Sequence, residues 1–418
     1  MHRSFLSLLA TTLGASALPY YFHQHYSSWM VDSIINRGHE PGRHYTDAVF
    51  YRGVEYVYNK TGEDKYLDYL QTSLDSILSP NGTFITWNRS PGAQKSLDDI
   101  RIGETLLFLH QMEPNNTRYL GAVEFLKDFL DGHARTPLGG FWHRDDIYTN
   151  QMWLDGIYMA DTFYAHYVSL FQPDNTTAWD DILHQYTLIE SRTRNETTGL
   201  LVHGYDEDRD EVWSDPETGA APHVWNRAVG WYFMALVDIL DYFPREHTGY
   251  QILMNFYTSL ASALLDFQDP ETHGWWLIMD PPYPGMDGNY IESSGTAMFA
   301  YGFLKGMRMG YLEEKEYRKP TQLAYELLTT YAVANGTNCT LNWQGTVEVG
   351  SLSGNGTYDV SFSILFWTPR LFFPRFAFWK LTSSSCSTTL VSRSRRTISR
   401  ELDLSSTLVR RSRPEAGR

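Results

Sequence analysis

Residues 151–170 read QMWLDGIYMADTFYAHYVSL, and this stretch shows how most of the chain is built. Its apolar residues recur at the three- and four-residue spacing of a helix. From about residue 27 to residue 335, similar segments alternate with short breaks rich in Gly, Pro and Asn, and few stretches alternate with the period of a strand. We therefore predict an all-α fold. The expected helices are eleven, at residues 29–37, 46–59, 65–78, 100–111, 119–132, 151–170, 177–191, 225–242, 250–267, 294–309 and 321–333.

These segments follow one another at roughly 25 to 35 residues, which favours stacked helical hairpins. The pattern is compatible with an open solenoid or with a closed ring of paired helices. Three longer connections, at residues 139–146, 200–221 and 273–292, contain many of the unusual residues. Long loops in a compact domain often build a site. In a ring, we expect them to gather at one mouth.

The composition favours a small or neutral ligand. The formal net charge is -15 and is spread along the chain, which argues against nucleic acid and anionic membranes as partners. Aromatic residues make up 15% of the chain, including 13 Trp and 28 Tyr. Their rings suit the apolar faces of sugars, although bulky helix packing accounts for most of them.

The N-terminus has the three-part pattern of a secretory signal. His2 and Arg3 precede an apolar stretch at residues 5–15, and Ala15-Ser16-Ala17 forms a small-residue cleavage site. We expect residues 1–17 to be a signal peptide, the alternative being a buried N-terminal helix. The apolar stretch is too short to span a membrane. The mature chain is thus predicted to be secreted, extracellular and free of the membrane.

Glycosylation sequons support this compartment. They begin at Asn59, Asn81, Asn88, Asn115, Asn175, Asn195, Asn335, Asn338 and Asn355. We therefore expect N-linked glycans. Only Cys339 and Cys386 are present, so a disulfide framework cannot hold the protein together.

The sequence changes character near Asp359. Residues 360–379 are aromatic and interrupted by Pro, and residues 383–418 are rich in Ser, Thr and Arg without apolar periodicity. We assign residues 18–359 to one domain and predict that residues 360–418 are an atypical, disordered tail. An altered reading frame or an unspliced end of the gene would produce such an abrupt change.

Two acidic residues at predicted helix starts are candidates for catalysis. Asp155 lies in a strongly apolar segment, where burial would raise its pKa and make it a general acid. A helix N-terminal Asp stabilised by the helix dipole is the alternative. Asp98 opens another helix, either as a cap or as a second carboxylate. Glycosidases commonly use two carboxylates about the sugar, which makes Asp98 and Asp155 a candidate pair.

Other candidate residues suit the binding of an acidic sugar. Arg227 offers a planar fork for a carboxylate, and Trp225 and Trp231 offer stacking faces, although cation–π packing in a core is the alternative. His143 and His203 lie in the long loops, which favours a functional role. No Cys/His spacing indicates a metal, and no cofactor motif is present. The acidic residues 206–211 could bind calcium but fit a solvated loop better.

Three segments together resemble glycoside hydrolase family 105, the unsaturated rhamnogalacturonyl hydrolases. They are residues 140–156, residues 223–231 and residues 292–298, and the resemblance covers about residues 27–358. It implies an (α/α)6 barrel of six helical hairpins. It also implies a mouth that binds a 4,5-unsaturated galacturonic acid at the non-reducing end of a pectin oligosaccharide.

The family's chemistry carries over onto matching positions of this chain. Asp155 matches an acid/base that protonates C4 of the unsaturated sugar, after which water adds at C5. Asp98 matches a carboxylate that positions the sugar or the water. The positions that line the substrate subsite are His143, His203, Trp225, Arg227 and Trp231. The Arg would bind the uronate carboxylate and the Trp rings would stack.

The chain departs from the family after Asp359, where a twelfth helix is expected, so the last helix is predicted to be missing or altered. A ring that lacks one helix would expose an apolar edge. Two alternatives to the proposed activity stay open. A sister family with the same barrel, the unsaturated glucuronyl hydrolases, acts on glycosaminoglycan fragments. A non-catalytic carbohydrate-binding barrel is the other alternative.

Overall fold

The computed structural model of the protein describes residues 25–87, 95–145, 147–350 and 352. The predicted signal segment, the tail from residue 360, and the sequons at Asn88 and Asn355 lie outside these residues. Eleven long helical segments are present in the described part, as the apolar periodicity predicts. They are α1 (Tyr26–Asn36), α2 (Tyr45–Thr61), α3 (Asp64–Ile77), α4 (Gly103–Met112), α5 (Thr117–Asp131), α6 continuing through η3 into α7 (Leu154–Gly156, Ile157–Asp161, Thr162–Phe171), α8 (Thr176–Thr193), α9 (Asn226–Ile239), α10 (Thr248–Asp266), α11 (Ser293–Met309) and α12 (Glu314–Leu327).

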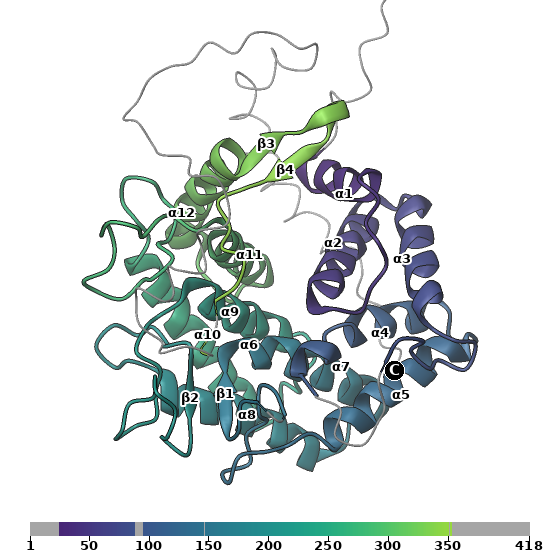
Figure 1. The fold of residues 1–418 in the computed structure, drawn as a ribbon, viewed down its shortest axis with the longest axis horizontal. Helices are drawn as coiled ribbons and strands as arrows, with labels where there is room; N and C mark the ends of the chain where they lie inside the picture. Colours follow the sequence, from purple (N-terminus) through teal and green to yellow (C-terminus); the bar gives the residue numbers. More distant parts are fainter. Residues whose placement is uncertain (1–24, 88–94, 146, 351, 353–418) are drawn as a thin grey trace, which may run out of the picture.

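The helices form hairpins arranged in a ring (Figure 1). Contacts between successive hairpins run from α2 through α4, α7 and α9 to α11, which places these helices on the inside. Each packs against the helix that follows it, so α3, α5, α8, α10 and α12 lie outside. The fold is the all-α architecture of (α/α)6 barrels, as predicted.

The ring has a break between α2 and α11 among the described residues (Figure 1). Helix α1 packs against α2 but has no hairpin partner within the described ranges. A short hairpin reaches α1 instead. Its strands β3 (Val333–Asn335) and β4 (Leu341–Trp343) follow α12, and the π-helical turn η4 (Leu328–Ala332) joins α12 to β3.

Two predicted helix boundaries were wrong. Residues 151–153 form a strand, β1 (Gln151–Trp153), which pairs antiparallel with β2 (Gly204–Asp206), so the helix begins at Leu154. Cross-strand hydrogen bonds outweigh the apolar periodicity there. Helix α12 begins at Glu314, well before residue 321, because its charged first turns carry no apolar pattern. Pro320, which usually ends a helix, is tolerated inside α12.

Local chemistry explains where helices begin and end. The carboxylate of Glu292 accepts a hydrogen bond from the Gly295 N–H at 2.7 Å and caps α11. Gly310, with φ of 75°, ends the same helix in the left-handed region, where glycine carries no steric penalty. No helix in the described part of the chain is both long and apolar enough to cross a membrane.

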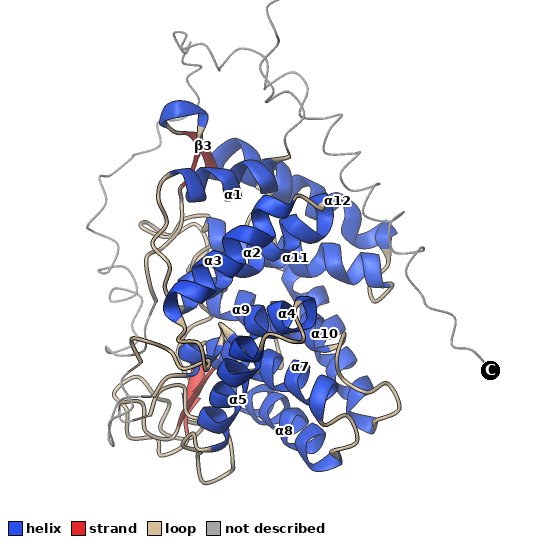
Figure 2. Cartoon of the chain, turned by 90° about the vertical axis from the view of Figure 1, so that its right-hand side faces the viewer, coloured by secondary structure: helices blue, strands red, loops and turns tan. Residues whose placement is uncertain are grey.

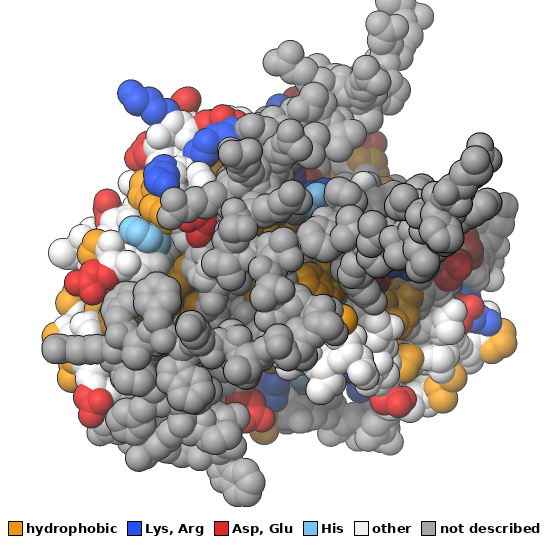
Figure 3. All heavy atoms as spheres, turned by 90° about the horizontal axis from the view of Figure 1, so that it is seen from above, with side chains coloured by type: hydrophobic (Ala, Val, Ile, Leu, Met, Phe, Trp, Pro, Cys, Tyr) orange, Lys and Arg blue, Asp and Glu red, His pale blue; other side chains and the backbone are white. Residues whose placement is uncertain are grey.

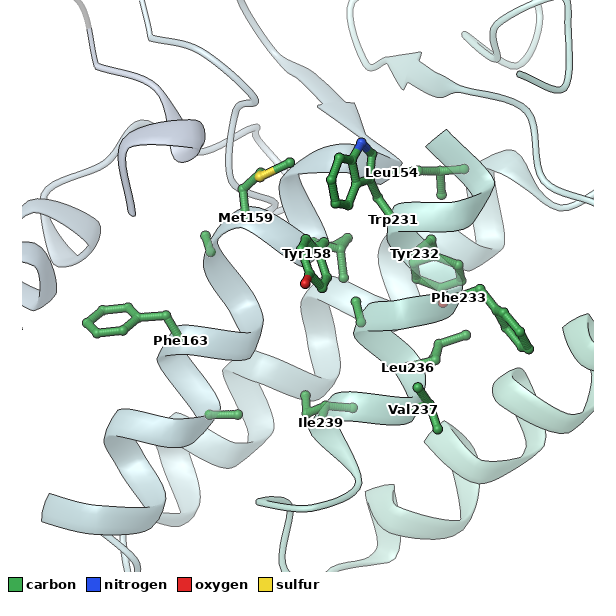
Figure 4. Close-up of a cluster of buried hydrophobic side chains, with 14 of the residues drawn as sticks. Leu154, Tyr158, Met159, Phe163, Trp231, Tyr232, Phe233, Leu236, Val237 and Ile239 are labelled. Carbon is green, nitrogen blue, oxygen red and sulfur yellow. The ribbon is translucent and has the colours of Figure 1, made fainter. Parts of the chain in front are cut away.

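The core lies between the two layers of helices. Figure 4 shows one part of it, where Tyr158 and Met159 of η3 face Trp231 and other residues of α9. The longer loops and strand β1 gather on one side of the ring, at the left of Figure 2. This arrangement places the long connections at one mouth, as predicted.

Candidate functional site

The centre of the site is a hydrogen bond between Asp155 and His203. Asp155 lies two residues after the end of β1, and His203 immediately precedes β2, so the pairing of the two strands brings them together. The distance from His203 Nε2 to Asp155 Oδ2 is 3.0 Å. Their side chains are 5% and 14% exposed, respectively. The fold therefore joins two of the predicted site residues that are 48 positions apart.

The predicted rise in the pKa of Asp155 was wrong. Burial does push this pKa upward, but the charge of His203, its hydrogen bond and the more distant His143 act in the opposite direction. Together they hold the pKa of Asp155 below its ordinary value. The sequence showed the apolar surroundings of the carboxyl group and did not show its basic partner.

His143 lies beside this pair in a stack of rings. Its imidazole is 4.5 Å from the Trp153 ring, with 14° between the planes, and Trp153 also meets the edge of His203. The main-chain N–H of His143 donates to the carbonyl oxygen of Gln151. Burial lowers the pKa of His143, against the opposing charges of Asp98 and Asp155. A buried ring stacked in this way is suited to positioning its neighbours.

Asp98 forms the second carboxylate of the site. It lies in the short helical turn η2 (Leu97–Ile100), whose cap is the Ser96 side chain, so Asp98 does not serve as the N-cap residue. Its Oδ2 accepts a hydrogen bond from Nη2 of Arg144 at 2.7 Å. The pKa values of both Tyr45 and His143 respond to the charges of Asp98 and Asp155, so the two carboxylates act on the same groups.

Trp225, Arg227 and Trp231 occupy the start of α9, and all three are buried. Trp225 is the N-cap residue and contacts the His203 ring, with 4.9 Å between ring centroids. Trp231 stacks on Tyr158 at 4.9 Å within the core, as Figure 4 shows. Trp225 thus contacts His203 of the Asp155–His203 pair directly, whereas Trp231 packs against Tyr158.

The guanidinium of Arg227 is already engaged by protein groups. Its Nε donates to Ser294 Oγ at 2.8 Å, and Nη2 lies 3.4 Å from Glu292 Oε1. Nη1 donates to the Glu348 carbonyl at 3.2 Å, and Nη2 also donates to the Val347 carbonyl. The sequence placed Arg227 in the site but could not show these partners.

Two site residues were missed by the sequence reasoning. Arg144 follows His143 in the quoted loop, and its pairing with Asp98 spans 46 positions. Tyr45 begins α2, and its pKa, which burial raises, is also affected by Arg227, Asp98 and Asp155. Local sequence offered a signal for Arg144, its place beside His143, but none for Tyr45.

The acidic loop at residues 206–211 begins at the last residue of β2. Carboxylate oxygens of Asp206, Asp208 and Asp210 lie within 4.8 Å of one another, close enough to hold a cation. However, the buried Asp206 carboxylate already accepts the backbone N–H groups of Asp208, Asp210 and Glu211. These hydrogen bonds hold the backbone of residues 206–211 in the conformation of a loop that follows β2.

The described surface shows no single-sign field in the view of Figure 3. Acidic, basic and hydrophobic side chains are interspersed over the coloured left-hand part of that face. A polyanion would need a concentration of Lys and Arg instead.

Comparisons with known proteins agree on the class of enzyme. Residues 19–359 match the sequence model of Glycosyl Hydrolase Family 88. A solved glycoside hydrolase of family 105 from C. acetobutylicum is 34% identical, with a TM-score of 0.76, and the match covers 81% of this chain and 93% of that one. Protein Atu3128 of Agrobacterium fabrum is 32% identical over 183 residues, which are 43% of this chain and 75% of that protein. The unsaturated rhamnogalacturonyl hydrolase YesR of Bacillus subtilis is 23% identical over 266 residues, which are 63% of this chain and 70% of YesR.

Proposed function

This chain belongs to Glycosyl Hydrolase Family 88, and on that premise we propose that it removes 4,5-unsaturated galacturonic acid from the non-reducing end of rhamnogalacturonan fragments. The observation that carries the proposal is the hydrogen-bonded pair of Asp155 and His203 at 3.0 Å. One carboxyl group with a basic partner, set beside aromatic rings, suits proton transfer to a sugar.

The substrate is a cyclic enol ether, and its hydration needs one proton and one water. The carboxyl group of Asp155 gives its proton to C4, and the positive charge that develops spreads over C5 and the ring oxygen. Water then bonds to C5 and returns a proton to Asp155. The C5–O5 bond breaks to leave a ketone at C5. The hemiacetal formed at C1 collapses to an aldehyde and releases the partner sugar.

The low pKa of Asp155 in the protein alone is compatible with this role. An incoming uronate brings a negative charge close to the carboxyl group, and a like charge raises the pKa of an acid. Asp98, held by Arg144, would position the sugar or the attacking water. The uronate carboxylate itself needs a cationic partner, and the site contains two guanidinium groups, those of Arg144 and Arg227.

The test is an absorbance assay with two substrates. The C=C bond of the unsaturated sugar absorbs ultraviolet light, and hydration removes this absorbance. We expect the loss with products of a rhamnogalacturonan lyase and little with the unsaturated disaccharide from chondroitin. If absorbance falls only with the chondroitin disaccharide, the chain acts as an unsaturated glucuronyl hydrolase instead. Binding of either sugar without any loss would identify a non-catalytic carbohydrate-binding barrel.

We also propose that the protein is secreted and glycosylated. The sequons whose Asn side chains lie in the described part are all on exposed residues, which supports glycan attachment; they are Asn59, Asn81, Asn115, Asn175, Asn195, Asn335 and Asn338. N-terminal sequencing of protein from the culture medium should begin at Leu18. Treatment with an N-glycosidase should lower its mass, and an unchanged mass would refute glycosylation.

A further inference from the structure

The helix that carries Asp155 contains a π-helical turn. Asp155 lies in α6, and the turn η3 begins two residues after it, at Ile157, before α7 continues the helix. A π-helical turn closes its hydrogen bonds over one more residue than an α-helical turn, and such turns are frequent at functional sites. Each residue of an α-helix rotates the next side chain by about 100°. The additional residue therefore sets the direction of the Asp155 side chain relative to α7.

Neighbouring structure fixes both ends of this turn. Upstream, β1 pairs with β2, and the backbone N–H of Leu154 donates to the His203 carbonyl at 3.0 Å. Downstream, the Phe163 ring packs against α4, where a Cβ atom at Gly103 would lie 2.4 Å from it. The additional residue must be accommodated between these two points. Backbone groups that leave the α-helical pattern there need other hydrogen-bond partners, because they are buried.

Arg101 supplies such a partner to the carbonyl of Tyr158. It follows η2 directly and is only 2% exposed. Its Nη1 donates to the Tyr158 carbonyl at 3.0 Å and to Thr162 Oγ1 at 2.6 Å, and its Nη2 donates to the Tyr158 hydroxyl at 3.0 Å. The Thr162 hydroxyl in turn donates to the same carbonyl at 3.0 Å. Arg101 and Thr162 therefore hold Tyr158, the second residue of the turn, by its backbone.

The Tyr158 ring connects Arg101 with an aromatic ring of the site. The guanidinium carbon of Arg101 lies 3.8 Å from the centroid of this ring. The same ring stacks on Trp231 at 4.9 Å, and Figure 4 shows the two side chains next to each other. One buried guanidinium therefore contacts both the backbone of the turn that follows Asp155 and the ring on which Trp231 packs.

The charge of Arg101 is balanced within the core. Oε1 of Glu104, on α4, lies 3.9 Å from its Nη1, and Oε2 of Glu104 lies 2.9 Å from Nδ1 of His166. All three side chains are buried. A buried charge is tolerated when it is paired and hydrogen-bonded. Arg101 can thus stay charged without any contact with a substrate.

We propose that Arg101 is a positioning residue: it holds the π-helical turn after Asp155 and so fixes the direction of this carboxyl group toward His203 and the substrate. Thr162 acts with it, as an acceptor for Arg101 and a donor to the Tyr158 carbonyl. This inference rests on the proposed function. A purely structural role would change stability alone, whereas positioning also changes the rate of proton transfer.

The test removes the Thr162 hydroxyl and then restores it. Thr162→Val keeps the shape of the side chain without the hydroxyl, and Thr162→Ser keeps the hydroxyl. We expect Thr162→Val to lower kcat about tenfold or more, with KM within about twofold of wild type, because a displaced acid slows proton transfer. Thr162→Ser should recover kcat to within about threefold of wild type. Arg101→Lys keeps the charge without the fork of donors and should lower kcat further.

Thr321→Val is the matched control. Thr321 of α12 is also fully buried, and its hydroxyl donates to the carbonyl four residues earlier, that of Tyr317, at 2.7 Å. Both valine variants lose such a hydrogen bond, so both melting temperatures should fall, but only Thr162→Val should lose kcat. Wild-type kcat in Thr162→Val, an equal loss of kcat in Thr321→Val, or no recovery in Thr162→Ser would overturn the inference.

Crystal structures of the two valine variants provide a readout that needs no turnover. The 3.0 Å hydrogen bond between Asp155 and His203 should be lost or lengthened in Thr162→Val and unchanged in Thr321→Val. An unchanged bond in Thr162→Val would contradict the positioning role. If the wild-type enzyme consumes no unsaturated uronide, the proposed function fails, while these structures still decide whether Thr162, together with Arg101, holds Asp155 in place.

Discussion

Among single residues, the chemistry depends on how Asp155 and His203 share a proton. Burial, the largest single influence, favours the neutral carboxyl group, whereas the charge and hydrogen bond of His203, 3.0 Å away, and the charge of His143 favour the carboxylate. Because these opposing influences together outweigh burial, the pKa of Asp155 in the protein alone lies below its ordinary value, and the group is ionised near neutral pH. In the proposed mechanism, Asp155 therefore needs the substrate's negative charge to act as an acid.

Asp155→Asn should abolish turnover and keep the fold. The amide has the size of the carboxyl group and can still accept the hydrogen bond of His203, but it has no proton to give to C4. We expect kcat to fall by roughly 10²- to 10⁴-fold or more, measured by loss of ultraviolet absorbance, with an unchanged melting temperature. Turnover at the wild-type rate would remove the acid/base assignment.

His203→Gln should move the pH profile upward. A protonated Asp155 is needed, so activity is present below its pKa and is lost as the pH rises through it. Gln keeps a donor near Asp155 but removes the charge that lowers this pKa, so the pKa rises. The high-pH limb of kcat against pH, which reports the enzyme with substrate bound, should therefore lie at higher pH in the variant. A limb that stays in place or moves to lower pH would contradict the pairing.

At the scale of elements, close packing of α9 against α11 holds one side of the site. Gly302 of α11 and Phe233 of α9 meet where the two inner helices approach each other. A Cβ atom at Gly302 would lie 2.4 Å from the Phe233 ring. Helices packed this closely leave no room for extra volume.

Gly302→Ala should therefore destabilise the protein, by about 1–3 kcal/mol from overpacking. Gly53→Ala on α2, where a Cβ meets open space, should instead stabilise it by roughly 0.5–1 kcal/mol, because alanine is the better helix former. Denaturant unfolding of the two variants measures both effects. Equal shifts in the same direction would show that α9 and α11 separate easily.

For the whole molecule, the ends of the ring are joined by polar contacts in the described part. Tyr56 of α2 and Tyr301 of α11 share a hydrogen bond at 2.9 Å across the break. Beyond it, α1 binds the β3–β4 hairpin, where Trp29 donates to the Cys339 carbonyl at 2.7 Å. Tyr56 is 37% exposed at this edge of the described ring.

Ser33→Ala should weaken this closure. The buried Ser33 hydroxyl accepts the backbone N–H of Leu341 at 2.8 Å, and its loss leaves that buried donor unsatisfied, at a cost of about 1–3 kcal/mol. Thermal unfolding measures the effect. Ser76→Ala is the control, because that exposed hydroxyl bonds back to Ser73 within α3, and it should have little effect. Equal melting temperatures for the two variants would mean that closure adds no stability.

The sequence by itself determined the class of fold and most of the site. Apolar spacing of three and four residues indicates helices, because a helix must bury one face, although residues 151–153 form a strand instead. Eleven helices, the loops at one mouth and the placement of His203, Trp225 and Arg227 follow from such local patterns and from motif resemblance. The tail after Asp359 stays a prediction.

The tertiary structure alone decided how these residues are paired. Whether the pKa of Asp155 rises or falls depends on His203, which lies 48 positions away and arrives through the pairing of β1 with β2. Likewise, Arg227 donates to the backbone carbonyl of Val347, 120 positions further along the chain. Charge and hydrogen-bond effects act over a few ångströms in space, whereas sequence patterns record only neighbours along the chain.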